Sequence, residues 1–249
     1  MKILKSVFLF ISIYAAFVGC SKKSDPVSSV CLLATATIDN NSSVSTYTYT
    51  NNKVTSSTNV SSGGSTTSNY SYDAQGRITS VATSSKYGST TSTSSETITY
   101  DAMGKVTEII SSTAKTEFTY NSSDQMVKED EYIYSNSTYI LSSSTSYTYP
   151  STSTKNYSTK KEYNGANVLQ DTFTYEYDTK QNQDAALFPA YPQPTNNRTK
   201  VTQTSNSSNS YVTTYTYTYN DNGFPLSVTE RSDGSNYTYT NVYTYTNCK

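Results

Sequence analysis

The chain of 249 residues contains no histidine and no tryptophan. Without histidine, it can form neither a Ser-His-Asp or Cys-His nucleophile system nor an ordinary zinc site. The sequence also has no glycine-rich loop of the kind that binds phosphate groups. We therefore predict a protein with no catalytic residue, no cofactor and no metal site.

Clusters of basic residues are also missing. The chain has 18 Lys and Arg against 19 Asp and Glu, a formal net charge of −1. A near-neutral chain of this kind is not expected to bind nucleic acid or to be drawn electrostatically to anionic lipid. Leu, Ile, Val and Phe are scarce, a composition that is common in disordered chains.

The N-terminus has the layout of a secretory signal, with Lys2 and Lys5 before an apolar stretch over 7–18. The segment Phe17-Val18-Gly19-Cys20 resembles a bacterial lipobox, although the family pattern prefers Leu where Phe17 stands. The resemblance implies cleavage before Cys20 and acylation of that cysteine, so that lipid chains hold the protein on a membrane. We assign a signal peptide to 1–19 and a lipidated tether to 20–30. An ordinary signal peptide with a chance cysteine is the alternative.

Tyrosine takes the place of the missing aliphatic residues, with 26 copies. Many alternate strictly with threonine, as in the run Tyr215-Thr-Tyr217-Thr-Tyr219. Successive side chains of a strand point to opposite faces, so each such run predicts rings on one face and hydroxyl groups on the other. Tyr and Thr are both favourable in strands, and a tyrosine ring buries a large area. The pattern predicts an ordered sheet in which tyrosine is the main hydrophobic residue.

A turn signal follows most of these runs. The clearest unit is Tyr70-Ser-Tyr72-Asp73-Ala-Gln-Gly76-Arg77-Ile78, and the segment from Ile98 to Ile109 repeats it nearly position for position. Asp or Asn opens such a turn with its side chain, and Gly supplies the positive φ that closes it. The spacing of these units, roughly 20–30 residues, is typical of a repeat architecture. The predicted turn residues are Asp73, Gly76, Asp101, Gly104, Asn121, Asn220 and Gly223.

The unit Tyr-x-Tyr-Asp-x-x-Gly-Arg-Ile resembles the YD repeat of RHS and teneurin-type proteins, and the whole chain resembles the short YD-repeat lipoproteins of Bacteroidota. The resemblance covers most of 44–246 and implies a long antiparallel sheet built from hairpins. We predict an all-β fold over 31–249, with this sheet curled into a barrel-like or closed sandwich arrangement. No toxin tip or self-cleaving protease domain is recognisable, so the toxin-delivery role of large RHS proteins is not implied.

Two further cysteines, Cys31 and Cys248, bracket this domain. Disulfides persist in exported compartments, so we predict a bridge between them. Such a bridge requires Cα atoms within about 7 Å and would make the first and last strands neighbours. Two free thiols, or thiols that pair between molecules, are the alternative.

The region 178–198 breaks the repeat and holds three prolines, which exclude a central strand. Gln181 to Phe188 could form two helical turns ended by Pro189. Long connections in a regular scaffold are often functional. Leu187, Phe188 and Tyr191 are therefore candidate ligand contacts, and the alternative that we favour is a cap in which these residues plug one end of the sheet.

Two functions fit these features. The first is a non-catalytic binding or adhesion module for polysaccharide or a partner protein, displayed on the outer membrane by its lipid anchor; exposed tyrosines suit such a surface. The second is a structural envelope lipoprotein that faces the periplasm and has its tyrosines buried. A glycan-active enzyme is a distant alternative, because no pair of carboxylates stands out. The alternating Thr and Ser disfavour a lipid-embedded barrel, which needs aliphatic residues there.

Overall fold

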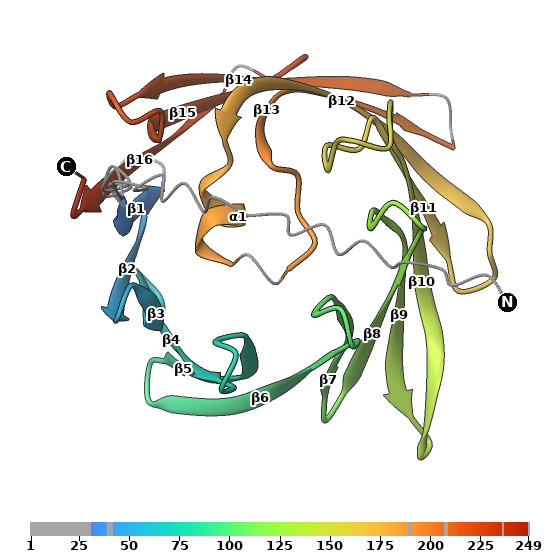
Figure 1. Ribbon diagram of the computed structural model, residues 1–249, viewed down its shortest axis with the longest axis horizontal. Coiled ribbons are helices and arrows are strands. Elements are labelled where there is room, and N and C mark those ends of the chain that lie inside the picture. Colours follow the sequence, from blue (N-terminus) through green and yellow to red (C-terminus); the bar gives the residue numbers. More distant parts are fainter. Residues whose placement is uncertain (1–30, 39–41, 189–190, 207–208, 236, 249) are drawn as a thin grey trace, which may run out of the picture.

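The computed structural model describes residues 31–38, 42–188, 191–206, 209–235 and 237–248. Sixteen antiparallel strands follow one another around a closed barrel, and β1 pairs with β16 to complete it (Figure 1). The all-β prediction is confirmed, and closure takes the form of a barrel. The predicted signal peptide 1–19, lipidation site Cys20 and tether 20–30 lie outside the described residues.

The elements have the following bounds. They are β1 (Leu32–Ile38), β2 (Ser43–Thr50), β3 (Lys53–Ser61), β4 (Gly64–Tyr72), β5 (Ile78–Tyr87), β6 (Thr90–Tyr100), β7 (Val106–Ser111), β8 (Ala114–Tyr120), β9 (Met126–Ser135), β10 (Thr138–Thr148), β11 (Thr159–Asn164), β12 (Leu169–Gln181), α1 (Gln183–Leu187), β13 (Asn196–Ser205), β14 (Ser210–Tyr219), β15 (Pro225–Ser232) and β16 (Thr238–Thr246). In the described part of the chain, no helix has the length and apolar character needed to cross a membrane.

The tyrosines of the repeats face the inside of the barrel. In β14, Tyr215, Tyr217 and Tyr219 are half-buried, and the threonines that alternate with them are exposed. The residues that pair with these tyrosines across the sheet share their face. The strict period of two therefore separates an aromatic inner wall from an outer wall of hydroxyl groups.

Because every strand pairs with its neighbours in the sequence, the connections fall alternately at two ends of the barrel. We call the end that carries the disulfide the proximal rim; it also holds the connections that follow the even-numbered strands. The other end, the distal rim, holds the hairpin tips that follow the odd-numbered strands. The YD-type turns all lie at the proximal rim.

These turns share one hydrogen-bond pattern. In the turn from Asp73 to Arg77, the Asp73 carboxylate accepts from the Arg77 backbone N–H at 2.8 Å, and Gly76 has a φ of +81°. The turns that begin at Asp101 and Asn220 repeat the pattern, with Gly104 and Gly223 at φ of +83° and +81°. In the turn of Asn121, the place of glycine is taken by Asp124, at a φ of +59°.

A second pattern joins each pair of strands across the sheet near the proximal rim. One tyrosine near the end of each even-numbered strand, or just beyond it, donates its hydroxyl hydrogen to a backbone carbonyl at or near the start of the preceding strand. The bonds are Tyr49 to Leu33, Tyr72 to Val54, Tyr100 to Ile78, Tyr120 to Val106, Tyr149 to Met126, Tyr177 to Tyr157, Tyr217 to Arg198 and Tyr245 to Pro225, at 2.5–3.0 Å. We call this ring of bonds the tyrosine ladder.

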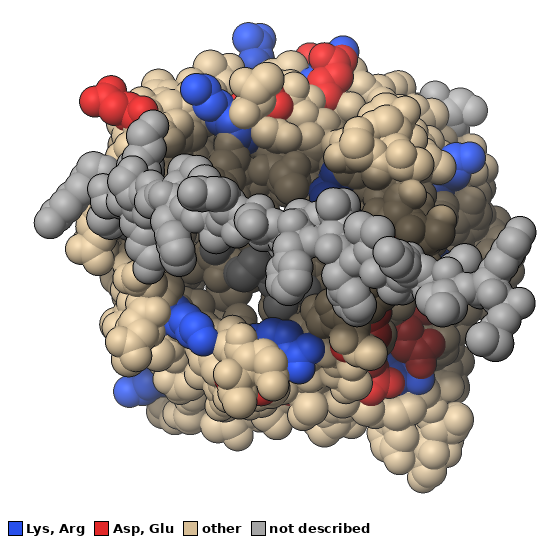
Figure 2. Space-filling model, viewed as in Figure 1, with Lys and Arg blue, Asp and Glu red and all other residues tan. Residues whose placement is uncertain are grey.

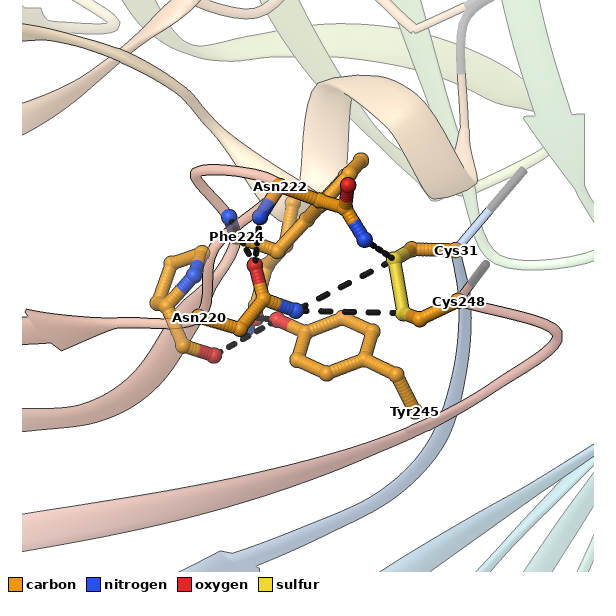
Figure 3. The surroundings of a disulfide bond; sticks show 8 residues. Cys31, Asn220, Asn222, Phe224, Tyr245 and Cys248 are labelled. Atoms are coloured by element: carbon orange, nitrogen blue, oxygen red, sulfur yellow. Dashed lines mark hydrogen bonds between the residues drawn. A yellow bond between two sulfur atoms is a disulfide. The ribbon is translucent and has the colours of Figure 1, made fainter. Parts of the chain in front are cut away.

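The predicted disulfide between Cys31 and Cys248 is confirmed, with a Cα–Cα distance of 4.4 Å. The disulfide joins the end of β16 to the start of β1. These are the last and first strands, so no turn of the chain connects them, and the disulfide takes the place of that turn. The neighbouring turn packs against it: the Asn220 and Asn222 side-chain amides lie 3.6–3.9 Å from the sulfur atoms (Figure 3). The same Asn220 side chain accepts from the backbone of Phe224, so one residue shapes the turn and contacts the closure.

We predict that the double variant Cys31→Ser/Cys248→Ser folds less stably. The bridge spans 217 residues, and the loss of its constraint on the unfolded chain lowers the free energy of unfolding by at most about 5 kcal/mol. Urea denaturation measures this. Reductant should destabilise the natural chain but leave the double variant unchanged, and an equal response of both would show that the bridge does not form. Intact mass should rise by two hydrogens on reduction.

We predict that Tyr100→Phe lowers the free energy of unfolding by about 1–2 kcal/mol, because the half-buried Ile78 carbonyl loses its partner at 2.6 Å. Tyr239→Phe is the matched control, since Tyr239 is 52% exposed and its hydroxyl bonds to no described residue; its effect should stay within about 0.5 kcal/mol. Chemical denaturation of both variants compares them. Equal stabilities would show that the ladder contributes nothing.

Candidate functional site in the barrel

The inner wall forms two apolar clusters near the proximal rim. The first has Ile78, Val81, Ile98 and Val106 at its centre, and the second has Met126, Tyr147 and Tyr157. Ladder tyrosines pack around both, and Phe118 contacts both. These clusters surround the segment that interrupts the repeat.

That segment lies inside the ring of strands (Figure 1). Since β12 extends to Gln181 and β13 begins at Asn196, the connection is 182–195, which is shorter than the expected 178–198. It begins with the short helix α1, whose first turn is capped by Asn182. Phe188 lies 5.6 Å from the ring of Tyr70, and both Phe188 and Tyr191 pack against the first cluster. We call the connection 182–195 the plug, because it packs against the wall from inside the barrel.

The three predicted ligand contacts in the plug, Leu187, Phe188 and Tyr191, are all half-buried. Phe188 and Tyr191 use part of their surface against the wall. Burial raises the pKa of the Tyr191 hydroxyl to about 12. That hydroxyl bonds to no described residue, so a role of Tyr191 in ligand binding stays a prediction.

Cationic side chains stack on the ladder tyrosines at the proximal rim. Lys53 lies over Tyr72, Arg77 over Tyr100 and Lys105 over Tyr120, at 4.5–5.4 Å from the ring centroids. Each cation comes from the turn that precedes its tyrosine in the chain, so the repeat itself builds these contacts. Figure 2 shows Lys and Arg side chains around the opening of the barrel (Figure 2).

Deeper in the barrel, Arg198 lies among the tyrosines of the second cluster. Its guanidinium donates to the Tyr157 hydroxyl at 2.8 Å and lies 5.2 Å from the ring centroid of Tyr175. No described carboxylate forms an ion pair with it. The tyrosine faces and hydroxyl groups stabilise this charge, and the carboxylate of Asp184 attracts it at longer range.

Carboxylates also face the interior, as the register shows. Glu129 pairs with Phe118 and Thr145 on the inner face and accepts from the Tyr147 hydroxyl at 2.7 Å. Burial, aided by the charge of Glu131, raises the pKa of Glu129. Within the described ranges, no group of three or more His, Cys, Asp or Glu residues could hold a metal ion.

A cavity of about 350 Å³ lies beside the plug at the proximal rim. Its walls come from the turn after β6, the turn after β8, the loop before β11 and the plug. The lining residues are Met103, Gly104, Lys105, Tyr120, Asp124, Met126, Tyr149, Lys155, Tyr157, Ala185, Tyr191, Pro192, Gln193 and Thr195. Of the residues singled out in the sequence, the fold thus brings Gly104 and Tyr191 together here.

The distal rim has a different character. Tyr87, Tyr211, Tyr237 and Tyr239 lie at or beside its hairpin tips and are 75%, 51%, 75% and 52% exposed. The connecting residues are mostly Ser, Asn and Gly, and Asp233 is the one charged residue among those that the structure describes. The hairpin tips therefore carry little charge and several exposed aromatic rings, and the exposed Lys86 and Arg231 lie on the strands beside them.

Sequence reasoning missed both surfaces. The rim tyrosines could have been found, because Tyr87 precedes Gly88 and Tyr237 follows a Ser-Asp-Gly-Ser tip, where an aromatic residue has no strand face to fill. Lys105 and Lys155 could not, because they are 50 residues apart and only the register of the sheet brings them to one cavity.

Searches for related proteins found no family model and no curated protein that matches the chain. Solved structures of similar shape include a porin-like protein from Bacteroides uniformis, with a TM-score of 0.48 and 14% identity over 86% of this chain and 97% of that one. A porin-like protein from Bacteroides vulgatus has a TM-score of 0.47 and 9% identity over 86% and 98%. The TcdB2-TccC3 structure has a TM-score of 0.35 and 14% identity, and the match covers 82% of this chain and 13% of that one.

Proposed function

We propose that this chain is a non-catalytic cell-envelope lipoprotein that binds polysaccharide through its distal rim. The observation that carries the proposal is the set of exposed tyrosines on that rim, set among Ser, Asn and Gly. Tyrosine offers a rigid ring that stacks on the C–H face of a sugar, and the neighbouring hydroxyl and amide groups can bond sugar hydroxyls. The scarcity of charge at the hairpin tips favours a neutral ligand.

The place where the chain enters the barrel supports an orientation in which the distal rim faces away from the membrane. Cys31, the first described residue, lies at the proximal rim beside Cys248. A tether over 20–30 that ends in a lipidated Cys20 would leave the barrel from that end. The distal rim would then point away from the membrane, toward ligands in the surroundings.

The structural envelope role is the second candidate, and one observation favours it. The ladder tyrosines are half-buried and their hydroxyls are all bonded within the protein, as expected of rings that serve as core. This role needs no ligand at the distal rim. A glycan-active enzyme that uses a carboxylate such as Glu129 is an outcome that the binding experiment also tests.

We predict that the triple variant Tyr87→Ser/Tyr237→Ser/Tyr239→Ser binds neutral polysaccharides at least tenfold more weakly than the natural chain, which corresponds to a loss of about 1.4 kcal/mol. Affinity electrophoresis in gels that contain dextran, mannan, xylan or starch measures this. Leu226→Ser/Val242→Ser is the control, since both residues are exposed apolar groups away from the rim tips. No retardation of the natural chain by any polymer would contradict the proposal, and shortening of a polymer would favour the enzyme.

We predict that protease added to intact cells removes the domain, because the proposal places the barrel on the outer surface. An antibody against 31–249 detects the loss, and lysed cells show that the domain can be digested. Survival in intact cells with digestion after lysis would place the barrel in the periplasm and favour the structural role.

A further inference from the structure

The cavity at the proximal rim is separate from the distal rim, and its chemistry is different. It is lined by four tyrosines, Tyr120, Tyr149, Tyr157 and Tyr191, and by two lysines. Its volume of about 350 Å³ is at the small end of the usual range for small-molecule sites, roughly 300–1,000 Å³. A ligand that fills it is therefore the size of one or two sugar rings.

The two lysines of the cavity differ in their partners. Lys105 Nζ lies 2.7 Å from Asp124 Oδ1 and 3.8 Å from Asp101 Oδ2, and the Asp124 contact raises the pKa of the lysine. Lys155 donates to the backbone carbonyl of Asp124 and forms no ion pair with a described residue. Lys155 is exposed at the cavity, so its charge is available to an anion.

The cavity also contains polar groups without partners. The Gln193 side chain and the Tyr191 hydroxyl line it, and neither bonds to a described residue. The hydroxyls of Tyr120 and Tyr149 are used in the ladder, and Lys105 lies over the ring of Tyr120, so the rings of Tyr149 and Tyr191 are the ones left for contact with a ligand. Ring faces, an unpaired ammonium group and an amide together suit a ring-shaped ligand that carries hydroxyls and one anionic group.

We propose that this cavity binds a saccharide unit that bears an oxyanion, with Lys155 contacting the carboxylate or phosphate and the tyrosine faces contacting the sugar ring. Gln193 and Tyr191 bond the sugar hydroxyls. The site is independent of polysaccharide binding at the distal rim. A sugar acid and a sugar phosphate share the chemistry that the cavity recognises, and the experiment separates them.

Isothermal titration of the full mature chain with D-glucuronate, glucose 1-phosphate, glucose and inorganic phosphate tests the proposal. We expect at least one of the two anionic sugars to bind at least tenfold more tightly than both glucose and inorganic phosphate. Tighter binding of glucuronate would identify a sugar acid as the ligand, and tighter binding of glucose 1-phosphate would identify a sugar phosphate. Binding of glucose as tight as that of both anionic sugars, or of inorganic phosphate as tight as that of both, would overturn the proposal.

Substitutions test which residues form the binding site. Lys155→Gln should weaken binding of the anionic sugar at least tenfold and leave the affinity for glucose unchanged. Lys180→Gln is the matched control, because Lys180 lies over the ring of Tyr219 and does not line the cavity. An equal effect of both variants would overturn the assignment.

Circular dichroism checks that Lys155→Gln is folded, and a Tyr191→Phe variant with weaker binding of every sugar gives a second readout that does not depend on charge. Polysaccharide retardation through the distal rim should be the same in all three variants, so failure at one site is distinguishable from failure at the other.

Discussion

The tyrosine ladder is the interaction on which the barrel depends. Each hydroxyl reaches a carbonyl on a neighbouring strand near the proximal rim, so every repeat is tied to the one before it. The last bond, from Tyr245 to Pro225, and the first, from Tyr49 to Leu33, lie on either side of the seam between β16 and β1. The ring of bonds is complete because Cys31 and Cys248 hold that seam where the chain has no turn.

Tyrosine also suits the width of this barrel. A barrel of sixteen strands is wide enough to leave an aqueous channel, and aliphatic side chains from the wall would not reach its centre. Tyrosine is long, buries a large ring area and can satisfy its polar end within the protein. The plug brings Phe188 and Tyr191 to the wall from the inside and completes the first cluster. The fully buried residues are mostly aliphatic, such as Ile78, Ile98 and Val106, and the half-buried tyrosines pack around them.

The two ends of the barrel differ because different parts of the repeat form them. The YD-type turns bring Asp, Lys and Arg to the proximal rim, where cations stack on ladder tyrosines and Lys155 remains unpaired. The distal hairpins are short Ser, Asn and Gly tips that carry exposed tyrosines such as Tyr87 and Tyr237. One repeat therefore gives a charged, plugged end and an aromatic end whose tips carry little charge, which the two proposals assign to different ligands.

The sequence by itself determined the strands, the turns and the closure. Alternation of Tyr and Thr has a period of two, the Asp73–Gly76 turn chemistry is local, and Cys31 and Cys248 bracket the domain. Only the tertiary structure decided that the sheet forms a barrel and that the tyrosines of the repeats point inward, because alternation separates two faces without saying which is concave. It also decided the cavity, since Lys105, Lys155 and Tyr191 meet only through the register of strands that are far apart in the chain.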